Sequence, residues 1–134
     1  MWDDAHAGLM LAHVRLAIID LSAAGHQPMV SACGRYVLVL NGEIYNHAVL
    51  RSRLEQAGRA PDWRGHSDTE SVLASFAEWG VEATLQACVG MFSLALWDRE
   101  ARIMFSGLRV QSELDTLYKV TCKVSDINST RSEK

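Results

Sequence analysis

The chain has 134 residues, of which 49% are hydrophobic and 22% charged, which is the composition of an ordinary globular domain with a core of its own. Its formal net charge of -3 gives no electrostatic reason to bind nucleic acid or an anionic membrane surface, and no apolar run is long enough to span a membrane. The three cysteines lack paired spacing and the five histidines are scattered, so we expect reduced thiols, a cytoplasmic location and no metal site.

The first predicted elements are a short polar loop at residues 1–7 and an apolar strand at residues 9–20. Arg15 is the unusual residue inside that strand. It is either an arginine that extends to solvent from an edge strand or a guanidinium that grips a carboxylate ligand with two hydrogen bonds.

A second apolar strand, at residues 36–40, runs directly into three polar groups. Asn41 offers an amide donor, Gly42 a backbone N–H that a ligand can approach closely, and Glu43 a carboxylate. The alternative is a type I′ hairpin turn at Asn-Gly. Few residues remain for a clean return strand before Asn46 opens a helix, which weakens the hairpin interpretation, and both interpretations stay open on this local evidence.

Two helices follow, and both have clear end signals. Asn46 is expected to be the N-cap of a helix at residues 48–57, which ends at Gly58. Ser67 and Glu70 have the spacing of a capping box at the start of the second helix. The apolar residues of the second helix are Val72, Leu73, Phe76 and Trp79.

A shorter helix around residues 82–88 is expected to turn Leu85 and Val89 inward, and a β-hairpin pairs residues 91–97 with 101–105. Residues 106–134 lack a sustained period and are expected to be unrelated, poorly ordered sequence. Strands at both ends with helices between them predict an α+β fold on a mostly antiparallel sheet.

The order of five motifs carries a resemblance to a known family. In the one-letter code they read HVRLAIIDLS, GHQPM, NGEIYN, GHSDTE and GMFSLALWD. This series resembles the class II glutamine amidotransferase domain of glutamine-hydrolysing asparagine synthetases, and it predicts a partial domain of this kind at residues 1–105. The resemblance implies an incomplete N-terminal-nucleophile-hydrolase fold, an antiparallel β-sandwich flanked by helices.

The resemblance also implies roles for individual residues. Arg15 would pair with the glutamine α-carboxylate, and the backbone around Leu16 and Ile18 would line the pocket. The Asn41 side chain and the Gly42 N–H would form an oxyanion hole. Glu43 and Asp68 would hold the α-amino group, which fits the need of a zwitterion for charges of both signs. Asp68 has a structural alternative, because a carboxylate at a helix N-terminus is favoured by the helix dipole.

The family's partners and reaction follow from the same resemblance. Glutamine is hydrolysed, and the ammonia passes to a synthetase domain that uses ATP and magnesium; we expect no cofactor within this chain. The family's nucleophile is an N-terminal cysteine, whereas this chain opens with Met1 and Trp2. Because the mechanism needs thiol and amine on one residue, we expect that the chain cannot hydrolyse glutamine by itself.

Two other interpretations stay open from the sequence. One is a non-catalytic module that binds glutamine or docks on a synthetase. The other is a gene fragment without function. A missing strand is also expected to leave neighbouring strands with unpaired edges, which favours aggregation or the addition of a partner strand.

Overall fold

The computed structural model describes residues 1–12, 25–109 and 120–123, and its central element is a five-stranded antiparallel sheet. Across the sheet the strands are β3 (Met29–Val30), β4 (Tyr36–Ile44), β5 (Gly90–Asp98), β6 (Ile103–Arg109) and β7 (Val120–Lys123). A separate ribbon pairs β1 (Trp2–Asp4) with β2 (Leu9–Leu11). The helices α1 (His47–Gln56), α2 (Asp68–Trp79) and α3 (Val81–Ala87) connect β4 to β5.

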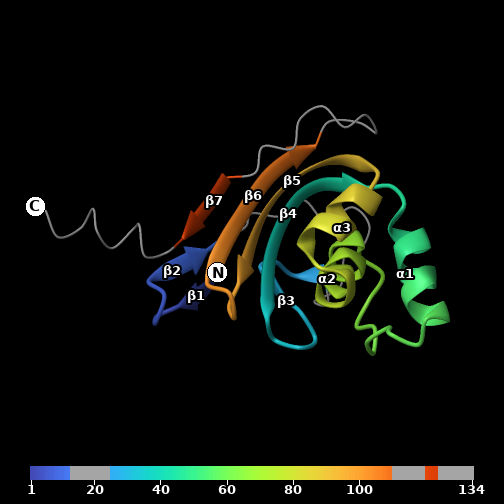
Figure 1. Cartoon of the computed structure of the whole chain (residues 1–134), viewed down its shortest axis with the longest axis horizontal. Helices are drawn as coiled ribbons and strands as arrows, with labels where there is room; N and C mark the ends of the chain where they lie inside the picture. Colours follow the sequence, from blue (N-terminus) through green and yellow to red (C-terminus); the bar gives the residue numbers. More distant parts are fainter. Residues whose placement is uncertain (13–24, 110–119, 124–134) are drawn as a thin grey trace, which may run out of the picture.

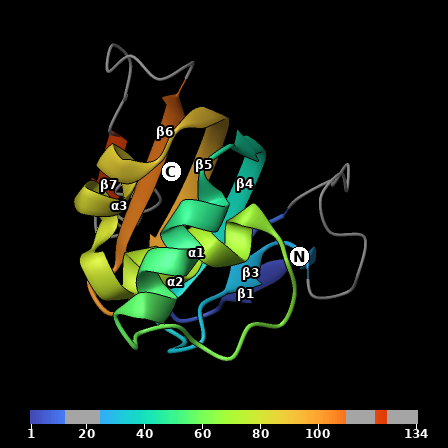
Figure 2. The same cartoon turned by 90° about the vertical axis from the view of Figure 1, so that its right-hand side faces the viewer.

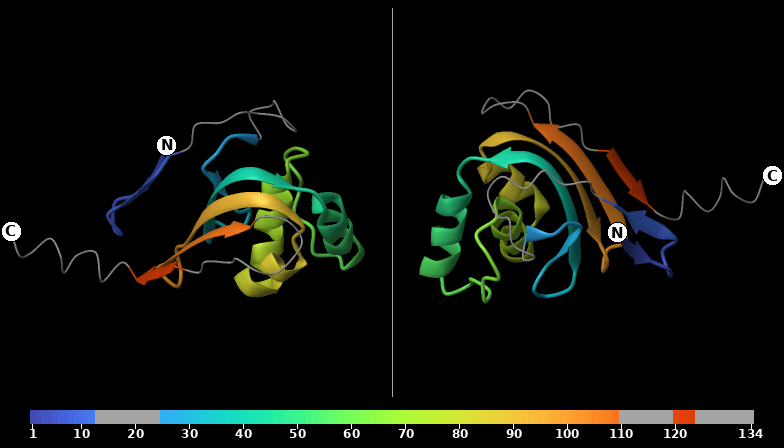
Figure 3. Two further views of the ribbon diagram at one scale, coloured as in Figure 1. Left: turned by 90° about the horizontal axis from the view of Figure 1, so that it is seen from above. Right: turned by 180° about the vertical axis from the view of Figure 1, so that it is seen from behind.

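The elements form layers on the two faces of this sheet. The helices cover one face, and the β1–β2 ribbon lies against the other (Figure 1). Figure 2 shows α1 and α2 in front of the sheet, and the view from above in Figure 3 shows the sheet between the ribbon and the helices. The predicted α+β fold, with antiparallel sheets flanked by helices, is confirmed.

Alternate residues of β4 supply both cores, because successive side chains of a strand point to opposite faces. Leu38 and Ile44 face the helices and are fully buried, whereas Val37 is buried with Trp97 beneath the ribbon. The helices add their own apolar residues on the first side, among them Leu50, Leu54, Val72, Leu73 and Phe76. Each fully buried side chain of this size stabilises the fold by about 1.5–3 kcal/mol.

The predicted end of α1 is confirmed in detail. Gly58 has φ +66 and its N–H donates to the carbonyl of Glu55 at 3.1 Å. The N–H of Arg59 donates to the carbonyl of Leu54 at 2.9 Å, which completes a Schellman motif. Glycine is required at such a position because a side chain is strained at positive φ.

At the start of α2, one of the two hydrogen bonds of the predicted capping box is formed. The Ser67 hydroxyl accepts the Glu70 N–H at 3.2 Å, so Ser67 is the N-cap as expected. The reciprocal bond of a capping box is not formed, because the Glu70 carboxylate instead accepts the N–H groups of Arg64 and Gly65.

Several predicted boundaries are wrong. Residues 1–7 contain β1 rather than being entirely loop, since Trp2–Asp4 pairs with β2. β4 does not end at residue 40 but continues through Ile44. The return strand of the hairpin is Ile103–Arg109 rather than 101–105, because residues 99–102 form the turn.

Two further expectations concern single positions. Val89 is 39% exposed and does not pack inward, because α3 ends at Ala87 before reaching it. Of the predicted strand at residues 9–20, the structure describes β2 at its start, and the rest lies outside the described residues. In the described part of the chain, no helix combines the length and apolarity that a membrane crossing needs.

Candidate functional site

The candidate site lies on the edge of β4 that faces away from β5. β3 is short and pairs only with Val37 and Leu38, so within residues 1–12, 25–109 and 120–123 the second half of this edge has no neighbouring strand. Side chains take the place of a strand there. The N–H of Leu40 donates to Gln27 Oε1 at 2.6 Å, and the N–H of Ile44 donates to Asp68 Oδ2 at 2.9 Å.

Gly42 lies between these two capped positions. Because N–H groups two residues apart in a strand point to the same edge, the N–H of Gly42 is directed to the same side as those of Leu40 and Ile44. Gly42 is exposed and has φ +103. A Cβ at this position would lie 2.2 Å from the carbonyl oxygen of Met91, so only glycine fits. The result is a backbone donor that a small ligand can approach.

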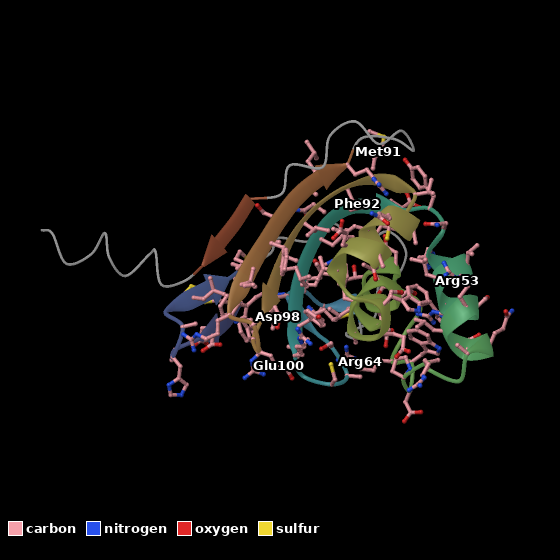
Figure 4. The ribbon with its side chains drawn as sticks, viewed as in Figure 1. Arg53, Arg64, Met91, Phe92, Asp98 and Glu100 are labelled. Atoms are coloured by element: carbon pink, nitrogen blue, oxygen red, sulfur yellow. The ribbon has the colours of Figure 1, made fainter. Side chains whose placement is uncertain are left out.

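The neighbours of Gly42 both present polar side chains to solvent. Asn41 and Glu43 are exposed, and their Cα partners on β5 are Ser93 and Met91. By strand alternation these two side chains lie on the face opposite the helices. Figure 4 shows Met91 at the end of the sheet opposite Asp98 and Glu100, which places this group at the far end from the hairpin turn.

Asp68 approaches the same strand end from the N-terminus of α2. It is 6% exposed, and its Oδ1 accepts the N–H of Thr69 at 2.8 Å while Oδ2 accepts that of Ile44. The structural alternative for Asp68 therefore has direct support, since the carboxylate joins the helix N-terminus to β4. A carboxylate has about four acceptor positions, so these bonds leave capacity for a ligand donor.

Of the predicted site residues, Asn41, Gly42 and Glu43 follow one another on β4, and Asp68 bonds to the same strand at Ile44 from the helix side. Asn41 takes part in an interaction of its own and is not a free group. Arg15, Leu16 and Ile18 lie outside the described residues. The interpretation of Asn-Gly as a hairpin turn is wrong, because both residues lie within the paired length of β4.

Gln27 is a residue that sequence reasoning did not single out. Its Oε1 caps the N–H of Leu40, and its Nε2 donates to Thr69 Oγ1 at 3.1 Å. The side chain therefore links the edge of β4 to the first turn of α2, where Asp68 lies. Its place in a motif directly before Pro28 was the available signal, although the contacts themselves are not visible in sequence.

Asn46 has a different role from the predicted one. It precedes α1 as the N-cap residue, but its side chain makes no capping bond. Instead its Nδ2 donates to the carbonyl of Ala87 and its Oδ1 accepts the N–H of Val89, both at 2.8 Å. Asn46 therefore connects the segment that follows β4 to the segment that precedes β5.

The described thiols lie away from Gly42 or are inaccessible. Cys88 is 1% exposed, and burial raises the pKa of its thiol to about 12, so it is protonated at neutral pH. Cys33 is exposed but lies before the opposite end of β4. From Tyr36 to Gly42 the strand spans about 20 Å at its usual rise per residue. Neither thiol can attack a carbonyl bound at Gly42.

A strong ion pair marks the opposite end of the sheet. Arg35 donates from Nε and Nη2 to the two oxygens of the buried Asp98 carboxylate at 3.0 and 2.7 Å. Burial alone would raise the pKa of Asp98, but the bonds from Arg35 and from two backbone N–H groups outweigh it and leave that pKa below its ordinary value. Among the described residues, no group of three or more potential ligands is arranged to hold a metal ion.

The family model and the curated relatives that match this chain point to the same protein family. The family model of the glutamine amidotransferase domain matches residues 1–120. The putative glutamine-hydrolysing asparagine synthetase of Mycobacterium tuberculosis is 43% identical over 107 residues, covering 77% of this chain and 16% of the relative. Asparagine synthetase B of Escherichia coli is 41% identical over 101 residues, covering 74% of this chain and 17% of the relative.

A third relative agrees with these two. The glutamine-hydrolysing asparagine synthetase 3 of Bacillus subtilis is 34% identical over 110 residues, which cover 79% of this chain and 17% of that protein. The matched region is therefore about one sixth of the length of each of these relatives.

Proposed function

This chain belongs to the glutamine amidotransferase domain family, and we propose that it binds glutamine as a part of a glutamine-hydrolysing asparagine synthase. Glutamine is the compound that the family's description names. We also propose that the ammonia derived from glutamine is used in asparagine biosynthesis by a part of the protein outside the matched region, since that region covers 16% of the Mycobacterium tuberculosis relative.

The observation that carries the proposal is the N–H of Gly42 on the edge of β4. The N–H groups on either side of it are bound by Gln27 and Asp68, whereas Gly42 itself is exposed in the part of the chain that the structure describes. Amide hydrolysis develops negative charge on the carbonyl oxygen, and fixed donors aimed at that oxygen stabilise it. A backbone donor held in a rigid sheet is well suited to this task, because it needs no reorganisation during binding.

The neighbouring residues complete a glutamine pocket in this proposal. The Asn41 amide is the second oxyanion donor, and Glu43 and Asp68 accept the α-ammonium group. Arg15 binds the α-carboxylate, while the backbone of Leu16 and Ile18 lines the pocket. Carboxylates are the natural partners of an ammonium group, and the spare acceptor capacity of Asp68 supports its share.

The same proposal holds that the 134-residue chain binds glutamine without hydrolysing it. Cys88 is buried and protonated, and Cys33 lies at the far end of β4. Hydrolysis by this family's chemistry needs a thiol beside the oxyanion donors. A synthetase domain as ammonia acceptor, with its ATP and magnesium, completes the proposal. The free thiols of Cys33 and Cys88 support a cytoplasmic location.

Isothermal titration of the purified chain with glutamine, with ammonia assayed on the same sample, tests this function. We expect saturable binding and no ammonia. Glu43→Gln should weaken binding by about tenfold, the value of one hydrogen bond to a charged group. Glu100→Gln is the matched control, since its side chain is 72% exposed beside Arg35 at the other end of the sheet.

Each outcome decides between the interpretations. Binding that is lost in Glu43→Gln but kept in Glu100→Gln supports the pocket. Ammonia release by the pure chain refutes the non-hydrolytic part. The absence of binding in the wild-type chain refutes the glutamine pocket itself and favours a fragment without function.

A further inference from the structure

The loop that leads to Asp68 is held by a buried carboxylate. The Glu70 side chain is 5% exposed, and its two oxygens accept the N–H groups of Arg64 at 2.6 Å and Gly65 at 3.0 Å. Its own N–H donates to Ser67 Oγ. Glu70 therefore holds residues 64–67, directly before Asp68, by hydrogen bonds from both its side chain and its backbone.

Arg51 of α1 holds the same loop from the other side. Its Nη1 donates to the carbonyl of Gly65 at 2.9 Å and its Nε to Ser71 Oγ at 3.2 Å. The guanidinium stacks over the ring of Trp63 at 4.0 Å from the ring centroid, and its Nη2 lies 3.8 Å from Glu70 Oε2. Gly65 is thus bound at its N–H by one residue and at its carbonyl by another.

We propose that Arg51 and Glu70 are positioning residues of the glutamine pocket, which act through Asp68 by clamping Gly65. This inference rests on the proposed function, because it concerns the α-ammonium contact assigned there to Asp68. Gly65 lies three positions before Asp68, and Ser67 between them starts α2. Where the clamp fixes Gly65, it fixes the place from which the Asp68 carboxylate reaches Ile44 and the ligand.

The clamp is well suited to positioning because it has little freedom. Both groups are charged, both are largely buried, and the bonds to ionised partners are the stronger kind. Figure 4 shows Arg64, next to Gly65, at the opposite end of the helix layer from Met91 and Phe92. The clamp therefore acts from outside the pocket, and neither of its members is expected to touch the ligand.

The test compares variants that keep side-chain size. Glu70→Gln keeps one acceptor but turns an amide N–H toward a second N–H, and Arg51→Lys loses the fork that reaches Gly65. Glu78→Gln is the control on α2, since Glu78 pairs with Arg59 near the surface. Arg53→Lys is the control on α1, since the Arg53 guanidinium stacks on the ring of Trp79.

Comparison of two ligands distinguishes a displaced Asp68 carboxylate from a general loss of the fold. Glutaramate is glutamine without its α-amino group, so it lacks the contact assigned to Asp68. Titration should show that Glu70→Gln and Arg51→Lys weaken glutamine binding by about tenfold and leave glutaramate binding unchanged. The two control variants should bind both ligands as the wild-type chain does. Equal weakening of both ligands overturns the proposal, because it indicates loss of fold rather than loss of position.

Amide hydrogen exchange supplies a reading that does not depend on a ligand. The N–H of Ile44 is bound by Asp68. We expect its exchange to accelerate in Glu70→Gln and Arg51→Lys relative to the ladder amides of β5, and to stay unchanged in the controls. Unchanged exchange in the clamp variants overturns the proposal. If the wild-type chain binds no glutamine, the proposed function fails, and the Ile44 exchange alone decides whether the clamp positions Asp68.

Discussion

Replacement of Gly42 by alanine is the most direct test of the geometry at the candidate site. The added Cβ would lie 2.2 Å from the carbonyl oxygen of Met91 and 2.8 Å from Cα of Phe92. Both are backbone atoms, so no side-chain rotation relieves the contact. The φ of +103 adds strain of its own, because L-residues rarely adopt it. We therefore expect the β4–β5 ladder to separate locally.

The magnitude follows from two contributions. A positive φ costs a non-glycine residue about 1–2 kcal/mol, and overpacking of a close-packed region costs about 1–3 kcal/mol. Gly42→Ala should therefore destabilise the fold by about 2–5 kcal/mol, the sum of the two. Gly34→Ala isolates the strain, since Gly34 has φ +76 and nothing within 4 Å of the added atom. Gly90→Ala reports mainly the clash, which is 2.2 Å to the carbonyl of Glu43.

Urea unfolding of the three variants and the wild-type chain measures these differences in stability, which appear as shifts of the unfolding midpoint when the m-value stays constant. Gly42→Ala should be the least stable of the three, with Gly34→Ala the mildest. Equal stability of Gly42→Ala and Gly34→Ala would refute the close approach of β5 to Gly42.

Two more predictions concern ionisable groups. Asp98→Asn should destabilise the chain by about 1–3 kcal/mol at neutral pH, because the Arg35 guanidinium loses its buried partner. The folded-state pKa of Asp98 lies below its ordinary value of 3.8, so the extra stability of the wild-type chain is present above pH 3.8 and is lost as the pH falls through the folded-state pKa. Urea unfolding of the wild-type and Asp98→Asn chains at neutral pH and at a pH below the folded-state pKa checks this. A difference in unfolding free energy that does not change with pH would contradict it. Alkylation followed by peptide mass mapping should label Cys33 in the native chain and Cys88 only after unfolding, because Cys88 is buried and its pKa is raised to about 12; fast native labelling of Cys88 would contradict its burial.

The parts of the fold that the sequence predicts correctly depend on neighbours along the chain. The C′ position of Gly58 follows from a glycine after a periodic apolar segment. The Ser67 cap follows from a hydroxyl three residues before an acidic residue. The β5–β6 hairpin follows from two apolar runs with a polar turn between them. In each case the residues that make the structure lie within a few positions of one another.

The errors arise where a distant partner competes for the same group. The Asn46 side chain directly precedes the first turn of α1, yet it bonds across to Ala87 and Val89. The Glu70 carboxylate prefers the N–H groups of Arg64 and Gly65 to that of Ser67. Local rules identify which residue is suited to bonding a backbone group, but the tertiary arrangement decides which group it bonds.

Side chains from elsewhere in the chain also protect the exposed edge of β4 against pairing with a further strand. An exposed strand edge with outward-directed N–H groups invites the addition of a further strand. On β4, however, Gln27 binds the N–H of Leu40 and Asp68 binds that of Ile44. An added strand would have to displace both side chains, one of them a buried carboxylate. The two side chains occupy the N–H groups on either side of Gly42 and therefore disfavour strand addition along this part of β4.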